Sequence, residues 1–207
     1  MPRHLGQVDA HKTDAILDAA GEVFAARGLS ASIDEVARRA SVSKQTIYNR
    51  YGSKTELLRA MVRRRVDSMS EPLHGPDPEA PVEDVLTVYA RRLMEQTLFT
   101  RAMTIMQVTM QAAGHMPEMA RAFYEAGPTA SRQALAAYLA EETCKGRLEV
   151  EDPMEAAEFF SGMVVTTRQM AALMGADIRL DPEQMDHISH EAAMRFVRAY
   201  APVRRPN

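Results

Sequence analysis

Apolar residues recur at helical spacing in the stretch from Ser32 to Tyr51. Ile33, Val36, Ala37 and Ala40 fall on one face of a helix that follows Ser32. A second short helical segment begins near Lys44, and its inward position is Ile47. The pattern predicts two short helices joined by a tight turn, with a third helix starting directly afterwards.

The ends of these helices carry capping residues. Ser32 and Glu35 have the spacing of a capping box, in which each side chain bonds the backbone of the other. Ser43 has the character of an N-cap for the second helix. That helix then presents a polar face to solvent, consisting of Lys44, Gln45, Thr46, Tyr48, Asn49 and Arg50. These side chains suit the major groove and its phosphates better than a protein core, which argues against a plain helical hairpin.

The remaining segments also follow a helical pattern. A helix over residues 13–27 is predicted to cover the pair, with Gly28 at its C-cap. A Pro-rich break spans residues 71–81, and no run typical of a β-strand occurs. Pro128 is expected to begin a new helix after a break at Gly127. The predicted helices after the pair are 54–70, 82–98, 100–113, 117–127, 128–145, 153–174 and 182–200. The fold class is therefore all-α.

Charge is distributed unevenly along the chain. The net charge is −3, but residues 1–70 hold 12 Lys and Arg against 8 Asp and Glu, while residues 71–207 hold 13 against 20. A basic N-terminal part on an acidic remainder fits a DNA-binding domain attached to a body that does not touch DNA. A single cysteine excludes an internal disulfide and, with no apolar run that could span a bilayer and no signal peptide, indicates a cytoplasmic protein.

Residues 13–62 resemble the DNA-binding domain of the TetR family of bacterial transcriptional regulators. The likeness lies in the stretch from Ile16 to Phe24, in Gly28, in Ile33 to Tyr51, and in Lys54, Glu56 and Leu57. It implies a three-helix DNA-binding domain over residues 1–53 and a larger helical ligand-binding and dimerisation domain over 54–207. The DNA contacts that this implies are Ser32, Ser43, Lys44, Gln45, Thr46, Tyr48, Asn49, Arg50 and Lys54.

Three positions differ from the commonest pattern of that family. Gln45 stands where Gly is frequent, Arg50 where an aromatic residue or His is frequent, and Tyr51 where Phe is frequent. An amide can pair bidentately with adenine, so Gln45 is a candidate for direct recognition of a base. The differences mean that an operator cannot be transferred from a relative. Landmarks such as Gly146-Arg147-Leu148 resemble the AcrR and AefR types of C-terminal domain.

Methionines are concentrated in the middle helices, among 15 in the chain. Met fills cores, and it also adapts its shape to varied ligands, so either role is open for any one of them. The family resemblance implies a ligand cavity between these helices. Its candidate lining residues are Met94, Phe99, Met103, Met106, Gln107, Met110, Phe123, Phe160, Met163 and Thr167, with Thr167, Gln107 or Arg168 fixing the orientation of the ligand.

The two last helices carry apolar residues at interface spacing. Phe159, Phe160 and Met163 belong to one helix, and Ala192 and Phe196 to the other. Such a pair closes the core of one subunit or packs against its twin in a four-helix bundle, and the resemblance favours the twin.

Other constellations have simpler explanations. His187 and His190 lack a third ligand at fixed spacing, so no metal site is expected. Cys144 has no resolving cysteine, so no redox-sensing role is expected for it. Residues 63–65 are interpreted as a solvated basic face of a helix. No catalytic motif and no cofactor motif occurs.

The sequence therefore indicates a homodimeric repressor that binds a palindromic operator in double-stranded DNA and is released by a small apolar or amphipathic inducer. Two alternatives remain open: a DNA-binding regulator controlled by a protein partner without a ligand, and a helical enzyme with a vestigial N-terminal domain. The outward Lys44, Gln45 and Tyr48 argue against the enzyme.

Overall fold

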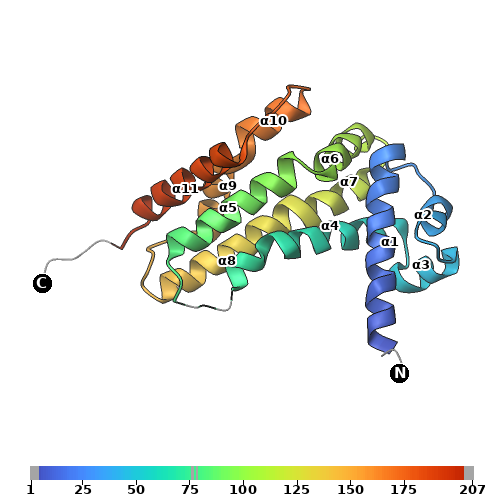
Figure 1. Ribbon diagram of the computed structural model, residues 1–207, viewed down its shortest axis with the longest axis horizontal. Helices are drawn as coiled ribbons and strands as arrows, with labels where there is room; N and C mark the ends of the chain where they lie inside the picture. Colours follow the sequence, from blue (N-terminus) through green and yellow to red (C-terminus); the bar gives the residue numbers. More distant parts are fainter. Residues whose placement is uncertain (1–4, 76, 78, 203–207) are drawn as a thin grey trace, which may run out of the picture. The chain divides into compact units, whose positions relative to one another are not determined.

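The computed structural model describes the backbone of residues 5–75, 77 and 79–202, and it describes their side chains from His11 onward. All regular elements in these ranges are helices, which confirms the all-α class (Figure 1). Within the same ranges, none of the helices has the length and apolar character needed to cross a membrane.

The chain forms two compact units, and each is described by itself. The first contains the described residues up to Arg65 together with Thr104–Gly127. The second contains Val66–Met103 and the described residues from Pro128 onward. The predicted division after residue 53 falls inside the first unit. As a division between DNA-binding and ligand-binding functions it stays a prediction.

The first unit is built around Phe24, which is fully buried. Ile16, Ile47, Leu57 and Leu58 pack in the same core, each at most 1% exposed. Burying one such side chain contributes about 1.5–3 kcal/mol, so this core fixes the orientation of the helices that carry it. Those helices are α1 (Leu5–Arg27), α2 (Ile33–Arg39), α3 (Lys44–Tyr51), the first part of α4 (Lys54–Ser70), most of α6 (Arg101–Ala112), and α7 (Pro117–Tyr124).

Helix α4 is tied to α1 by Arg64. Its guanidinium pairs with Asp14 at 3.0 Å and also with Asp18. Arg64, predicted on a solvated basic face, is partly exposed and forms these ion pairs at the surface. Arg59, one turn earlier, pairs with Glu125 at 2.9 Å. These contacts hold α4 on two sides within the first unit.

The expected break at Pro128 is absent from the described chain, and this prediction was wrong. The chain instead continues from α7 through a π-helical turn, η2 (Glu125–Thr129), that includes Pro128. A π-turn widens the helix by one residue, and this accommodates a proline that lacks an N–H donor. Within the first unit the turn brings Gly127 close to α4, where an added Cβ would lie 3.1 Å from Cγ1 of Val62.

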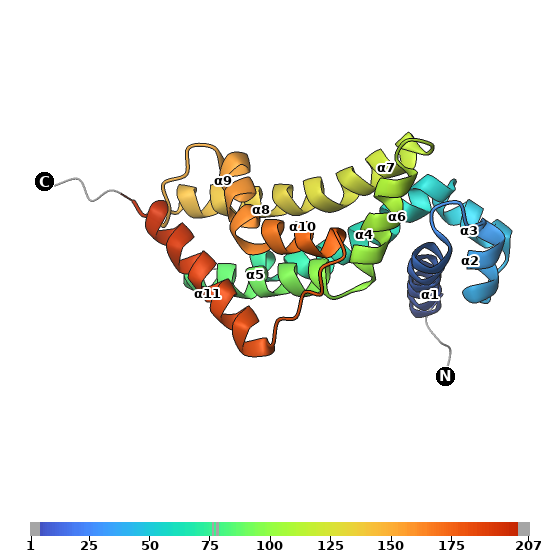
Figure 2. The same cartoon turned by 90° about the horizontal axis from the view of Figure 1, so that it is seen from above.

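The second unit contains the remaining helices. They are η1 (Glu71–His74), α5 (Val82–Leu98), α8 (Ala130–Cys144), α9 (Pro153–Ser161), η3 (Gly162–Thr166), α10 (Thr167–Leu173) and α11 (Pro182–Ala199). The predicted bounds of α5 are confirmed. The helix predicted over 153–174 runs through α9, the π-turn η3 and α10 without a break and ends at Leu173. Helix α11 packs against α5 (Figures 1 and 2).

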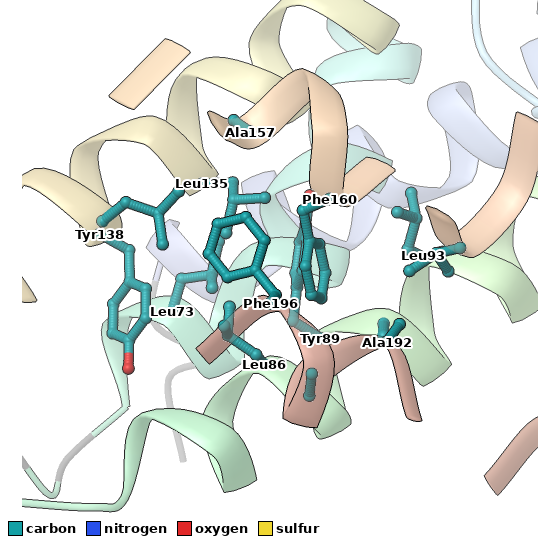
Figure 3. Packing of buried hydrophobic residues seen from close by; sticks show 14 of the residues in the cluster. Leu73, Leu86, Tyr89, Leu93, Leu135, Tyr138, Ala157, Phe160, Ala192 and Phe196 are labelled. Carbon is teal, nitrogen blue, oxygen red and sulfur yellow. The ribbon is translucent and has the colours of Figure 1, made fainter. Parts of the chain in front are cut away.

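Aromatic residues form the centre of the second core (Figure 3). Phe160 lies between Tyr89 and Phe196, with ring centroids 6.2 Å and 5.2 Å away. The Tyr89 hydroxyl is 2.9 Å from Oγ of Ser131, and burial raises the pKa of Tyr89 to about 12. This core joins α5, α8, α9 and α11 into one body.

Candidate DNA-binding surface

Two capped helices carry the surface. The Ser32 N–H donates to Oε2 of Glu35 at 2.8 Å, and Oγ of Ser32 accepts from the Glu35 N–H at 3.3 Å, so the predicted capping box is present. The bond from the Ser32 backbone holds the pKa of Glu35 below its usual value. Oγ of Ser43 accepts from the Thr46 N–H at 3.1 Å. Both helices therefore begin where the sequence predicts.

The turn between them is tight. Ser41 adopts a positive φ of 54°, which few residues other than glycine adopt, and Val42 packs partly buried against the first core. Ile47 is 1% exposed on the inner side of α3. These anchors fix which side of α3 faces outward.

The outward side of α3 carries Lys44, Gln45, Tyr48 and Asn49, all exposed. The Lys44 ammonium pairs with Oδ2 of Asp34 at 2.9 Å, and this bond raises the pKa of the lysine. The Gln45 Nε2 donates to Oδ1 of Asn49 at 2.6 Å. A cationic, amide-rich helix face of this kind can contact phosphates and base edges together.

Three other predicted contact residues also bind within the protein. The Thr46 hydroxyl lies 2.8 Å from that of Ser43. Arg50 donates to the hydroxyl of Thr13 on α1. The Lys54 ammonium lies 6.0 Å from the centre of the Phe24 ring, and partial burial lowers its pKa. Their contacts with DNA stay predictions.

Two features of this surface were missed in the sequence. Asp34 lies ten residues before Lys44, and a separation of ten gives no helical signal because the turn intervenes. The pair of Gln45 and Asn49 does have a signal, since residues four apart in a helix are neighbours and Gln–Asn hydrogen bonds occur at that spacing.

The candidate ligand-lining residues are distributed over both units. Met94 and Phe160 are fully buried in the second core, and Phe123 is buried in the first. Met103 packs against the second core and Met106 against the first. Gln107 is half-buried, whereas Phe99, Met110, Met163 and Thr167 are exposed. A shared ligand cavity stays a prediction.

The C-terminal helices combine core and surface positions. Phe160, Ala192 and Phe196 close the subunit's own core. Phe159, Met163, Met170 and Met174 are exposed by 57%, 42%, 56% and 82%. We call these four residues the Phe159 face; Phe159 lies in α9, Met163 in η3 and Met170 in α10, and Met174 follows α10 directly. The residues expected at an interface are thus divided between the subunit's own core and the exposed Phe159 face.

Comparison with known proteins identifies both parts of the chain. Residues 16–61 match the family described as bacterial regulatory proteins of the TetR family. Residues 84–202 match the C-terminal domain of AefR-like transcriptional repressors.

Individual relatives agree with these matches. The solved structure of the flavonoid-responsive regulator FrrA is 30% identical, with a TM-score of 0.70, and the match covers 94% of this chain and 99% of FrrA. A TetR-family regulator from Mesorhizobium loti shares the fold at 24% identity and a TM-score of 0.77, covering 93% of this chain and 98% of the other.

A curated relative matches in a shorter stretch. The transcriptional activator FasR of Mycolicibacterium smegmatis is 47% identical over 55 residues, which span 26% of this chain and 25% of FasR. Members of the matched family are DNA-binding regulators and not enzymes. The chain belongs to the TetR family of transcriptional regulators and has an AefR-like C-terminal domain.

Proposed function

We propose that this protein is a homodimeric repressor that leaves its operator when a small apolar or amphipathic molecule binds its C-terminal domain. The observation that most supports DNA binding is the exposed polar face of α3, which belongs to a capped and anchored helix-turn-helix. Repression is supported by the match to AefR-like repressors over residues 84–202.

The Phe159 face supports the dimer. Large apolar side chains rarely gather on a surface without a partner, and here three methionines and a phenylalanine follow one helical stretch. A two-fold dimer would place two α3 helices for symmetric half-sites about one DNA turn, or a multiple of it, apart.

The relation to FrrA supports the ligand. FrrA responds to flavonoids, and this chain matches nearly its whole length at 30% identity. The partly buried Met106 would give an adaptable apolar wall, and the half-buried Gln107 beside it in the same unit would offer a polar group for orientation. A ligand releases DNA only if it binds the DNA-incompetent state more tightly than the competent one.

A three-step experiment tests this proposal. The full-length protein first selects duplexes from a random library, and Tyr48→Ala should weaken binding to all of them. A thermal-shift screen with flavonoids, fatty acids and other aromatic or amphipathic compounds then identifies ligands. Fluorescence anisotropy finally measures whether each ligand releases the selected operator.

Met106→Trp should abolish release, because it fills space at the proposed wall. Its operator affinity without ligand and its melting temperature check that the first core, against which Met106 packs, still holds α3 in place. Val88→Trp is the control, since Val88 is 48% exposed and lies outside both the proposed wall and the Phe159 face. Operator binding that no stabilising compound alters would contradict the inducer and favour a regulator controlled by a protein partner. A protein that selects no duplex would overturn the DNA-binding part.

A further inference from the structure

The side-chain amides of Gln45 and Asn49 form a pair on the exposed face of α3. Nε2 of Gln45 donates to Oδ1 of Asn49 at 2.6 Å. The two residues are one helical turn apart, and both are exposed. The orientation of the Gln45 amide is therefore set by a neighbour on the same rigid helix before any DNA arrives.

The bond to Asn49 changes what Gln45 can offer to a base. A glutamine amide has two N–H donors and one carbonyl acceptor. One N–H is used by Asn49, so one donor and one acceptor remain side by side. Adenine presents an acceptor at N7 and a donor at N6 in the major groove, which this pattern complements.

Guanine presents a different edge. Its N7 and O6 are both acceptors, so a glutamine needs both N–H groups to satisfy them. With one N–H committed to Asn49, the Gln45 carbonyl oxygen would face an acceptor of guanine. The same bond that prepares the amide for adenine therefore disfavours guanine.

We propose that Asn49 is a positioning residue that makes Gln45 specific for adenine over guanine at one position of each operator half-site. The inference rests on the DNA-binding part of the proposed function. It predicts an A·T pair at that position of the operator. It also assigns the choice of base to Asn49, which acts through Gln45.

The test compares four proteins on one set of duplexes: wild type, Gln45→Ala, Asn49→Ala and Asn49→Asp. Selection from random DNA defines the operator, and anisotropy then gives relative affinities for A and G at each position. The wild type should prefer A over G at one half-site position by roughly 5- to 150-fold, as expected for a bidentate contact. Gln45→Ala should lose that preference alone.

The Asn49 variants separate positioning from structure. Asn49→Ala frees the second N–H of Gln45, so the preference for A over G should fall several-fold at that position and stay unchanged elsewhere. Asn49→Asp keeps the acceptor and should retain the preference, while its negative charge weakens binding to all sequences. Thermal unfolding and non-specific binding at low salt check that each variant is folded.

Replacing the selected adenine by 7-deazaadenine removes the N7 acceptor. It should weaken wild-type binding and leave Gln45→Ala unaffected. An operator whose every position is indifferent to Gln45→Ala overturns the inference and leaves the regulator intact, as does an Asn49→Ala protein with unchanged preference. A wild type that selects no operator would instead overturn the proposed function.

Discussion

Lys44 carries its own counter-ion. Its ammonium lies 2.9 Å from Oδ2 of Asp34, and both side chains are about half exposed. A lysine that pairs with phosphate must first leave this carboxylate, and the carboxylate itself repels the DNA backbone. Asp34 is therefore expected to reduce affinity for all sequences equally, because phosphate contacts carry no sequence information.

Asp34→Asn should strengthen binding to operator and random DNA by a similar factor. The slope of log affinity against log salt should steepen by up to about one, because Lys44 becomes free to displace one more counter-ion. Titrations between about 50 and 200 mM salt measure both effects. Asp67→Asn, at an exposed position of α4, is the control for the change in net charge. Equal effects of the two variants would contradict a role for the pair.

At the scale of an element, α2 depends on its capping box. Hydrogen bonding from the Ser32 backbone lowers the pKa of Glu35 below the ordinary value for a glutamate. A carboxyl with a lowered folded-state pKa contributes stability that is fully present above its unfolded value and is lost as pH falls through the folded value. The box should therefore support α2 at neutral pH and weaken below about pH 4.5.

Ser32→Ala should destabilise the protein by about 0.5–2 kcal/mol. Glu35→Gln keeps a hydrogen-bonding group at the same position but removes its titration, so its stability should fall less between pH 5 and 3 than that of the wild type. Thermal unfolding over that range measures the difference. Glu118→Gln serves as the control, because Glu118 lies in the first turn of α7, whose N-cap makes no side-chain bond. Parallel curves for wild type and Glu35→Gln would refute the link.

At the scale of the whole molecule, the Phe159 face is the proposed contact between two subunits. Phe160 and Ala192 belong to the core of each subunit, so replacing them would test folding. Phe159 and Met170 are exposed, and charge there would be buried only in a dimer.

Phe159→Glu and Met170→Glu should each weaken the dimer by about 2 kcal/mol or more if they lie at the centre of the interface. Sedimentation velocity at micromolar concentration should then show monomers that retain the wild-type melting profile of the subunit and bind operator poorly. Val88→Glu is the control, since Val88 is an exposed apolar residue of α5. A monomeric wild type, or dimers that survive both changes, would contradict the assignment.

Local signals predicted most of the fold, including the capped helices α2 and α3 and the outward side of α3. Ser32, Ser43 and Ile47 act within a few residues of their own positions, so their roles followed from spacing. The bounds of α5 followed from its apolar periodicity and the preceding prolines.

The features that the sequence did not predict depend on packing between residues that are far apart in the chain. In the sequence Pro128 looks like a helix break, but the chain continues through the π-turn η2, in which Gly127 lies close to Val62. The inward Phe160 and outward Phe159 are adjacent and chemically alike, so only the packed core distinguishes them. The pairing of Lys44 with Asp34 depends on the geometry of the turn between their helices.

The close approach of Gly127 to Val62 has a consequence for how this protein can evolve. A methyl group at residue 127 would meet Cγ1 of Val62 at 3.1 Å, so a larger residue there requires space to be made in α4. The two positions should therefore covary among homologues, with glycine facing valine or larger residues and alanine or serine facing a smaller partner. Val62→Ala should make Gly127→Ala tolerable, because it removes the methyl group that the new Cβ would meet. The two substitutions together should therefore be accepted where Gly127→Ala alone is not.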